Sequence, residues 1–206
     1  MAAVRGGLNE STRGNRRVSA PASGLDVRDF PAVVLSAGTV LYRIHRDGYD
    51  PWWFSRDGSQ RFDLPGPWGT CYLAGAPMGA FLETLGRLVI IPAADVAIRR
   101  LAVITVTQEL RLAGCQAPAA AGYGVTATTS AGYPYEQVSH PWARRFWRAG
   151  FDGVRYGAAH HPALVETSYA LFGRSDQPTS YGTFSSGPIS AALLDEAQAV
   201  FGFRIV

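Results

Sequence analysis

The sequence predicts a single mixed α/β domain. Its 206 residues are enough for one well-buried core and short for two. Apolar residues make up 47% and charged residues 17% of the chain, a balance typical of a folded protein rather than a disordered one. Segments with the two-residue period of strands also alternate with segments that have the period of amphipathic helices. We therefore expect strands and helices to interleave around one core.

The first half of the domain is predicted to begin with a tail, a strand and a long loop. Residues 1–24 are rich in Gly, Ser, Asn and Arg and have no hydrophobic period, so we expect a flexible tail and a domain over residues 25–206. Residues 39–45 alternate as a strand that carries Arg43 on one face. Residues 46–69 contain Gly, Pro, Asp and three tryptophans, which indicates a loop. Loops of this length are usually functional, and the tryptophans either close over a ligand or form the loop's own core.

A second strand is predicted at residues 70–74, and Pro77 is well placed to open the helix that follows. We expect this helix to reach Val89 and to pack on a sheet, because its apolar residues form one stripe: Met78, Phe81, Leu82, Leu85, Leu88 and Val89. Residues 113–132 are predicted to be weakly structured or a loop. The remaining predictions are strands at 101–107, 153–156, 166–172 and 203–206, and helices at 191–200 and at 140–149, the latter capped by Ser139.

Composition argues against several classes of protein. The two cysteines, Cys71 and Cys115, make no disulfide framework and no zinc pattern, so we expect no metal. The most apolar region, residues 85–106, includes a proline and several charges, which argues against a membrane helix. No secretory signal is recognisable, which leaves a cytoplasmic location as the expectation. A net charge of only +3 from scattered arginines argues against nucleic-acid binding.

Four residues in a short span can carry chemistry on a dinucleotide. The forked donors of Arg43 and Arg61 suit a pyrophosphate. Tyr72 offers an aromatic ring, and the carboxylate of Glu83 can stabilise the oxocarbenium-like state in which an N-glycosidic bond breaks. No phosphate-binding glycine motif is present, so a dinucleotide would need another geometry.

Each of the four residues also has an ordinary interpretation. Glu83 is followed at i+4 by Arg87, so the two can form an exposed ion pair. Arg43 can be an edge-strand arginine in water. Tyr72 can be a half-buried sheet residue, and Arg61 a solvated loop residue. None of them identifies a site by itself.

The order of these residues resembles the RES-domain family, whose members look like diverged ADP-ribosyltransferases and consume NAD. The likeness begins at Leu41-Tyr42-Arg43 and passes through Arg61-Phe62, residues 69–74 and Ala80-Phe81-Leu82-Glu83. It resumes at Trp142-Ala143 and residues 149–156, and ends near Leu171-Phe172. The resemblance implies an ADP-ribosyltransferase-like α/β fold in which two small sheets flank an NAD cleft.

Residue roles follow from the same resemblance. Arg43 would grip the pyrophosphate, Tyr72 would stack at the nicotinamide end, and Glu83 would act at the nicotinamide ribose. Arg61 would contact phosphate or ribose, and no metal is implied.

The family commonly has a serine shortly after the Gly-x-Arg-Tyr strand, where this chain has Ala158. That departure leaves nucleotide binding in place and puts full turnover in question, although Ser168 or Thr167 of the next strand can offer a replacement hydroxyl. His160, two residues further on, is either a solvated loop histidine or a ligand of substrate phosphate or ribose.

The resemblance therefore implies an NAD glycohydrolase or phosphorylase that acts as the toxin of a toxin–antitoxin pair, with NAD as its substrate. Its partner would be an antitoxin protein with a DNA-binding domain. Two alternatives remain open. One is an ADP-ribosyltransferase that modifies a macromolecule or small molecule, with residues 113–132 as the docking place of the acceptor. The other is a nucleotide-binding module that has lost turnover.

Overall fold

The computed structural model describes residues 20–163 and 165–206, so most of the expected N-terminal tail lies outside the described residues. The strands are β1 (Ala32–Leu35), β2 (Val40–Arg46), β3 (Trp68–Ala74), β4 (Ile90–Ile91), β5 (Arg99–Val106), β6 (Leu110–Gly114), β7 (Gly153–Gly157), β8 (Thr167–Arg174), β9 (Gly182–Pro188) and β10 (Arg204–Ile205). The α-helices are α1 (Pro77–Leu85), α2 (Ala93–Ala97), α3 (Ala127–Ala131), α4 (Ser139–Arg148) and α5 (Ala191–Phe201), with a 3₁₀ helix at Pro118–Tyr123.

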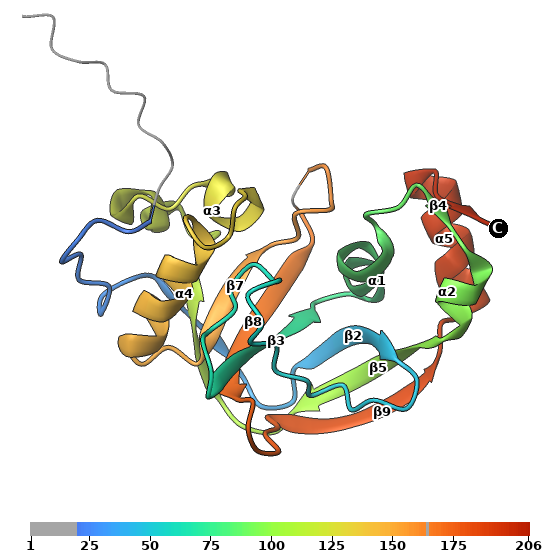
Figure 1. The fold of residues 1–206 in the computed structure, drawn as a ribbon, viewed down its shortest axis with the longest axis horizontal. Coiled ribbons are helices and arrows are strands. Elements are labelled where there is room, and N and C mark those ends of the chain that lie inside the picture. Colours follow the sequence, from blue (N-terminus) through green and yellow to red (C-terminus); the bar gives the residue numbers. More distant parts are fainter. Residues whose placement is uncertain (1–19, 164) are drawn as a thin grey trace, which may run out of the picture.

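Eight of the strands form one curled sheet in the order β1-β6-β7-β8-β3-β2-β5-β9 (Figure 1). Long antiparallel ladders join β3 to β8 and β2 to β5, whereas β2 and β3 share the single register pair Tyr42–Ala74. The sheet therefore divides at this point into two halves that separate from each other. The predicted mixed α/β fold with a split sheet is confirmed.

Helices cover the two halves of the sheet separately. Figure 1 shows α3 and α4 beside β7 and β8, and α1, α2 and α5 toward the opposite end. The side chains of Phe62, Trp142 and Phe146 belong to the core under α4. Those of Phe81 and Leu193 belong to a second core between α1, α5 and the sheet. A third core fills the other face of the sheet. The space where β2 and β3 part thus lies between two separately packed units.

Helix α1 begins as predicted, with Pro77 in its first turn, but it ends earlier than expected. The chain leaves the helix at Gly86, whose N–H donates to the carbonyl of Leu82. Leu88 and Val89 are exposed rather than part of the buried stripe. Their helical spacing was misleading, because the chain turns here to pair β4 with β10.

Several other expectations need correction. Residues 113–132 are not a loop: they include the 3₁₀ helix and α3, held by the buried side chains of Val125 and Thr129. Ser139 is the first residue of α4 rather than its cap, and its hydroxyl donates to the carbonyl of Arg61. Among the described residues, no helix is long and apolar enough to span a membrane.

Candidate active site

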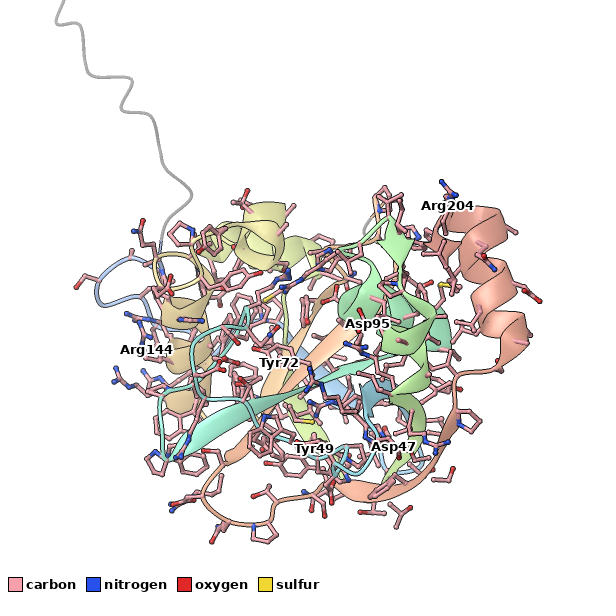
Figure 2. All side chains as sticks on the ribbon, turned by 45° about the vertical axis from the view of Figure 1, so that its right-hand side comes forward. Asp47, Tyr49, Tyr72, Asp95, Arg144 and Arg204 are labelled. Atoms are coloured by element: carbon pink, nitrogen blue, oxygen red, sulfur yellow. The ribbon has the colours of Figure 1, made fainter. Side chains whose placement is uncertain are left out.

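A pocket of about 400 Å³ opens where β2 and β3 separate, a volume within the range of small-molecule sites. Strand β2, the loop after it, β3, α1 and two distant tyrosines all contribute to its wall. Figure 2 shows Tyr72 near the middle of the molecule, away from the exposed Asp47 and Tyr49. The wall residues are Tyr42, Arg43, Ile44, Trp53, Ser55, Asp57, Ser59, Gln60, Arg61, Tyr72, Leu73, Ala74, Ala80, Glu83, Thr84, Arg87, Tyr135 and Tyr156. The four predicted residues Arg43, Arg61, Tyr72 and Glu83 therefore meet in one pocket.

Arg43 is fixed by the loop that follows its own strand. Its Nη1 donates to the carbonyl oxygens of Pro51 at 2.6 Å and Trp53 at 3.0 Å, and it lies 2.8 Å from the Sγ of Cys71. The guanidinium is thus not a freely solvated edge-strand group. Within the described part of the chain, its Nε and Nη2 make no hydrogen bond, so this half of the fork can bind a ligand in the pocket.

Arg61 is a buried cation, with a relative exposure of 6%. Its guanidinium carbon lies 5.5 Å from the ring centre of Tyr135 and 5.8 Å from that of Tyr156, which is cation–π distance. Its Nε is buried without a hydrogen-bond partner, and no described carboxylate forms an ion pair with it. A buried charge without a counter-charge is costly, and the two aromatic rings offset only part of that cost. The pocket is therefore prepared for an anion at this point.

Tyr72 is held by hydrogen bonds at its phenol oxygen. The hydroxyl donates to Oδ1 of Asp63 at 2.8 Å and accepts from the N–H of Phe62 at 2.8 Å. Burial, reinforced by the Asp63 carboxylate, raises the pKa of Tyr72 well above its usual value. The phenol is therefore neutral and fully engaged. Tyr72 offers the pocket its ring rather than an acidic proton.

Asp63 holds this arrangement together, and nothing in the sequence singled it out. Its side chain is 3% exposed, and its Oδ2 accepts from the hydroxyl of Ser55 at 2.9 Å and from the N–H of Gln60 at 3.1 Å. Burial raises the pKa of this carboxyl, and the hydrogen bonds from Tyr72, Gln60 and Ser55 oppose the shift. Asp63 thereby ties the loop to β3.

Glu83 comes from α1 and is half-buried. Its Oε1 is buried and has no hydrogen-bond partner, and the structure contains no ion pair between Glu83 and Arg87 among the described residues. The exposed ion-pair interpretation is therefore wrong. The Glu83 carboxylate adds to the burial that raises the pKa of Tyr156, and it opposes the burial that lowers the pKa of His160. An unpaired carboxylate thus lies close to both side chains.

Two of the candidate binding residues, Ala158 and His160, do not belong to the pocket wall. Ala158 is completely buried, and its N–H donates to the carbonyl of Glu166 at 2.8 Å. His160 is half-buried, and neither of these described residues lines the pocket. Ser168 is buried and pairs in register with Tyr156 on β7, but it does not line the pocket either. The structure thus leaves the position of the family serine without a hydroxyl.

Two further wall residues, Tyr135 and Tyr156, were not predicted from the sequence to be site residues. Tyr156 lies within the short strand β7, like many buried tyrosines, and Tyr135 belongs to a segment without a period. They reach the pocket only because α4 and β7 bring distant parts of the chain together. No group of three or more His, Cys, Asp or Glu side chains suited to a metal occurs among the residues that the structure describes.

The fold and the pocket together define a class of protein: a split-sheet α/β domain with two guanidinium groups, an aromatic ring and an unpaired carboxylate at the split. The family model of the RES domain matches residues 40–184, which run from β2 into β9. The chain belongs to the RES-domain family, and the resemblance seen in the sequence is confirmed. No curated protein matches the chain.

One similar solved structure is a chain in the "Crystal structure of the M.tuberculosis MbcT-MbcA toxin-antitoxin complex". The TM-score is 0.60 with 19% sequence identity, over 81% of this chain and 92% of that chain. The likeness at this identity concerns the fold.

Proposed function

We propose that the protein is an NAD-consuming enzyme that cleaves the bond between nicotinamide and ribose. One observation carries the proposal: the unpaired carboxylate of Glu83 faces the same pocket as the guanidinium groups of Arg43 and Arg61. A dinucleotide presents two such features to a protein, a doubly charged pyrophosphate and a glycosidic bond that breaks with positive charge on the ribose. The pocket offers guanidinium groups to the pyrophosphate and a carboxylate to the positive charge that develops on the ribose.

The chemistry follows from these placements. The free half of the Arg43 fork and the buried Arg61 guanidinium bind the pyrophosphate. Glu83 lies at the nicotinamide ribose, where its negative charge stabilises the oxocarbenium-like state as the C1′–N bond breaks. The bonding electron pair leaves with nicotinamide, which becomes neutral. Water or phosphate then attacks C1′ and gives ADP-ribose or its phosphorylated form, and the acceptor's proton passes to solvent.

The identity of the acceptor distinguishes cleavage of NAD from ADP-ribosyl transfer, the alternative reaction. Transfer of ADP-ribose to a macromolecule or another small molecule needs a second binding place beside the pocket. The expected docking segment, residues 113–132, contains ordered helical turns packed on the core. We therefore favour water or phosphate, which need no second docking place.

A protein partner is the second part of the proposal. The similar fold in the MbcT-MbcA structure occurs in a toxin–antitoxin complex, and RES proteins are commonly toxins of such pairs. We propose that this chain is the toxin of a pair. Its antitoxin, which we expect to carry a DNA-binding domain, would cover the pocket and prevent loss of cellular NAD.

Nicotinamide release from NAD by the purified protein tests the enzymatic proposal. We expect release by the wild type and a loss of at least about a hundredfold in Glu83→Gln, the scale of an electrostatic contact made in the transition state. Glu196→Gln is the matched control, because Glu196 is an exposed carboxylate on α5. Mass spectrometry of the products, with and without phosphate, distinguishes hydrolysis, phosphorolysis and transfer. A wild type that binds NAD without releasing nicotinamide, or an active Glu83→Gln variant, would remove the proposal.

A further inference from the structure

The loop between β2 and β3 contains three consecutive aromatic residues with different surroundings. Trp52 and Phe54 are buried, with exposures of 7% and 4%, and both rings lie edge-on to Tyr181. Trp53, between them, is 65% exposed and lines the mouth of the pocket. The tryptophans were expected either to close over a ligand or to form the loop's own core. Trp52 instead joins the core of the sheet with Leu41 and Cys71, and Trp68 lies on β3 beside Trp147. Trp53 alone of the three tryptophans lines the pocket.

The backbone that carries Trp53 is firmly held. Before it, the N–H of Trp52 donates to Oδ1 of Asp50 at 2.7 Å. Its own carbonyl accepts from Nη1 of Arg43 at 3.0 Å. After it, Ser55 and Thr70 exchange two backbone hydrogen bonds of 2.9 and 2.7 Å. The indole is therefore displayed at the rim of the pocket by an anchored segment.

A large aromatic side chain held in water is unusual, because tryptophan is highly buried on average. Where such a ring borders a pocket, stacking on a planar ligand accounts for its exposure. Polar and charged residues share this part of the pocket wall: Asp57 and Ser59 are exposed and line the same pocket. This rim is therefore not an extended apolar patch of the kind that marks a protein interface.

We propose that the indole of Trp53 is the stacking platform for the adenine base of the dinucleotide. The inference rests on the proposed function, and it adds that the adenosine half of the substrate is recognised by stacking. Arg43, the pyrophosphate ligand, is hydrogen-bonded to Trp53, so the platform adjoins the centre of the dinucleotide. Glu83 lines the same pocket as Tyr156, which is buried, whereas Trp53 is exposed. Because the pyrophosphate separates the two nucleosides, the base on the Trp53 side is the adenine.

The proposal predicts that the protein distinguishes NAD from nicotinamide mononucleotide. The mononucleotide contains the same scissile bond but lacks the adenosine half. Stacking of a base on an aromatic side chain corresponds to a factor of about ten to a hundred in affinity. We expect the wild type to use the mononucleotide with a kcat/KM at least about tenfold lower than that for NAD.

Steady-state release of nicotinamide is the first test, with Trp53→Ala, Trp53→Phe and the control Tyr49→Ala. Tyr49 is an equally exposed aromatic residue of the same loop, at 64%, and is not part of the pocket wall. Trp53→Ala should raise the KM for NAD at least about tenfold and leave kcat within about twofold, because the ring does not touch the scissile bond. Trp53→Phe should keep part of the affinity, and Tyr49→Ala should match the wild type. Activity on the mononucleotide should be the same in Trp53→Ala as in the wild type.

Calorimetric titration with ADP-ribose is the second test, since this ligand keeps the adenine and lacks the scissile bond. Weaker binding to Trp53→Ala by about tenfold or more supports the platform, whether or not the wild type releases nicotinamide. If the wild type binds ADP-ribose but releases no nicotinamide from NAD, the proposed function is wrong and the adenine platform stands. An unchanged KM and ADP-ribose affinity in Trp53→Ala, equal use of NAD and the mononucleotide, or no ADP-ribose binding by the wild type overturns the platform. A change of oligomeric state in Trp53→Ala with unchanged ADP-ribose affinity would assign the ring to a protein contact and overturns it too.

Discussion

The phenol of Tyr72 donates a 2.8 Å hydrogen bond to the buried carboxylate of Asp63. The same carboxylate receives the Ser55 hydroxyl and the Gln60 N–H, so one side chain joins β3 to the loop that carries Trp53 and Arg61. A stacking ring keeps its place only if its polar end is held. This pair therefore fixes the ring against which we place the nicotinamide.

Replacement of Tyr72 by phenylalanine should separate structure from catalysis. The ring remains, but the Asp63 carboxylate loses a donor while staying buried, which costs about 1–3 kcal/mol in the free energy of unfolding. The kcat of nicotinamide release should fall by less than about threefold, because the ring and not the proton is used. Urea unfolding and steady-state kinetics measure the two quantities. Tyr49→Phe is the control on an exposed ring, and a loss of kcat as large as that of Glu83→Gln would instead assign the Tyr72 hydroxyl to the chemistry.

The stability of the protein at acidic pH should depend on Asp63. Burial raises the pKa of this carboxyl above its ordinary value of 3.8, so the folded protein binds more protons than the unfolded chain between the two values. The contribution of protonated Asp63 to the free energy of unfolding is therefore complete below the ordinary pKa. It decreases as the pH rises through the pKa of the folded protein. The free energy of unfolding of the wild type, relative to Asp63→Asn, should therefore fall with rising pH from about 3.8 upward and then level. A difference between the two proteins that stays constant over this range would show that Asp63 titrates normally.

Replacement of Arg61 should have little effect on the stability of the free protein but a large effect on its stabilisation by a ligand. Because Arg61→Met keeps much of the side-chain volume and removes an unpaired buried charge, its free energy of unfolding without ligand should stay within about 1 kcal/mol of the wild type. The rise in Tm that ADP-ribose gives to the wild type should be lost in this variant, since the pyrophosphate loses its buried ligand. Thermal unfolding with and without ADP-ribose measures both. Arg56→Met, an exposed arginine of the same loop, should behave like the wild type, and an Arg61→Met variant with an undiminished ligand shift would refute the role.

The sequence singled out four residues that the structure brings together in one pocket, but it did not single out the groups that hold them in place. Arg43 and Glu83 each had an ordinary interpretation when considered alone, and they were singled out because their order along the chain resembles the RES-domain family. Asp63 was not, since an aspartate in a loop is ordinarily solvated and only tertiary contacts bury it. The edge strand β9 was missed for a similar reason: its glycines and serines are mostly exposed and show no apolar alternation. The end of α1 was misplaced because Leu88 and Val89 continue the helical spacing by chance.

The close approach between the loop and β3 leads to the last prediction. A Cβ at Gly69 would lie 2.7 Å from the carbonyl oxygens of both Phe54 and Ser55, so Gly69→Ala must push the loop away from β3. We expect a loss of about 2 kcal/mol or more in the free energy of unfolding. We also expect a raised KM for NAD, because Trp53 and Arg61 move with the loop. Gly187→Ala is the matched control, since a Cβ at Gly187 on β9 meets nothing within 4 Å, and its stability should stay within about 0.5 kcal/mol of the wild type. A Gly69→Ala protein that is destabilised but keeps the wild-type KM would mean that the loop binds the dinucleotide without being held by β3.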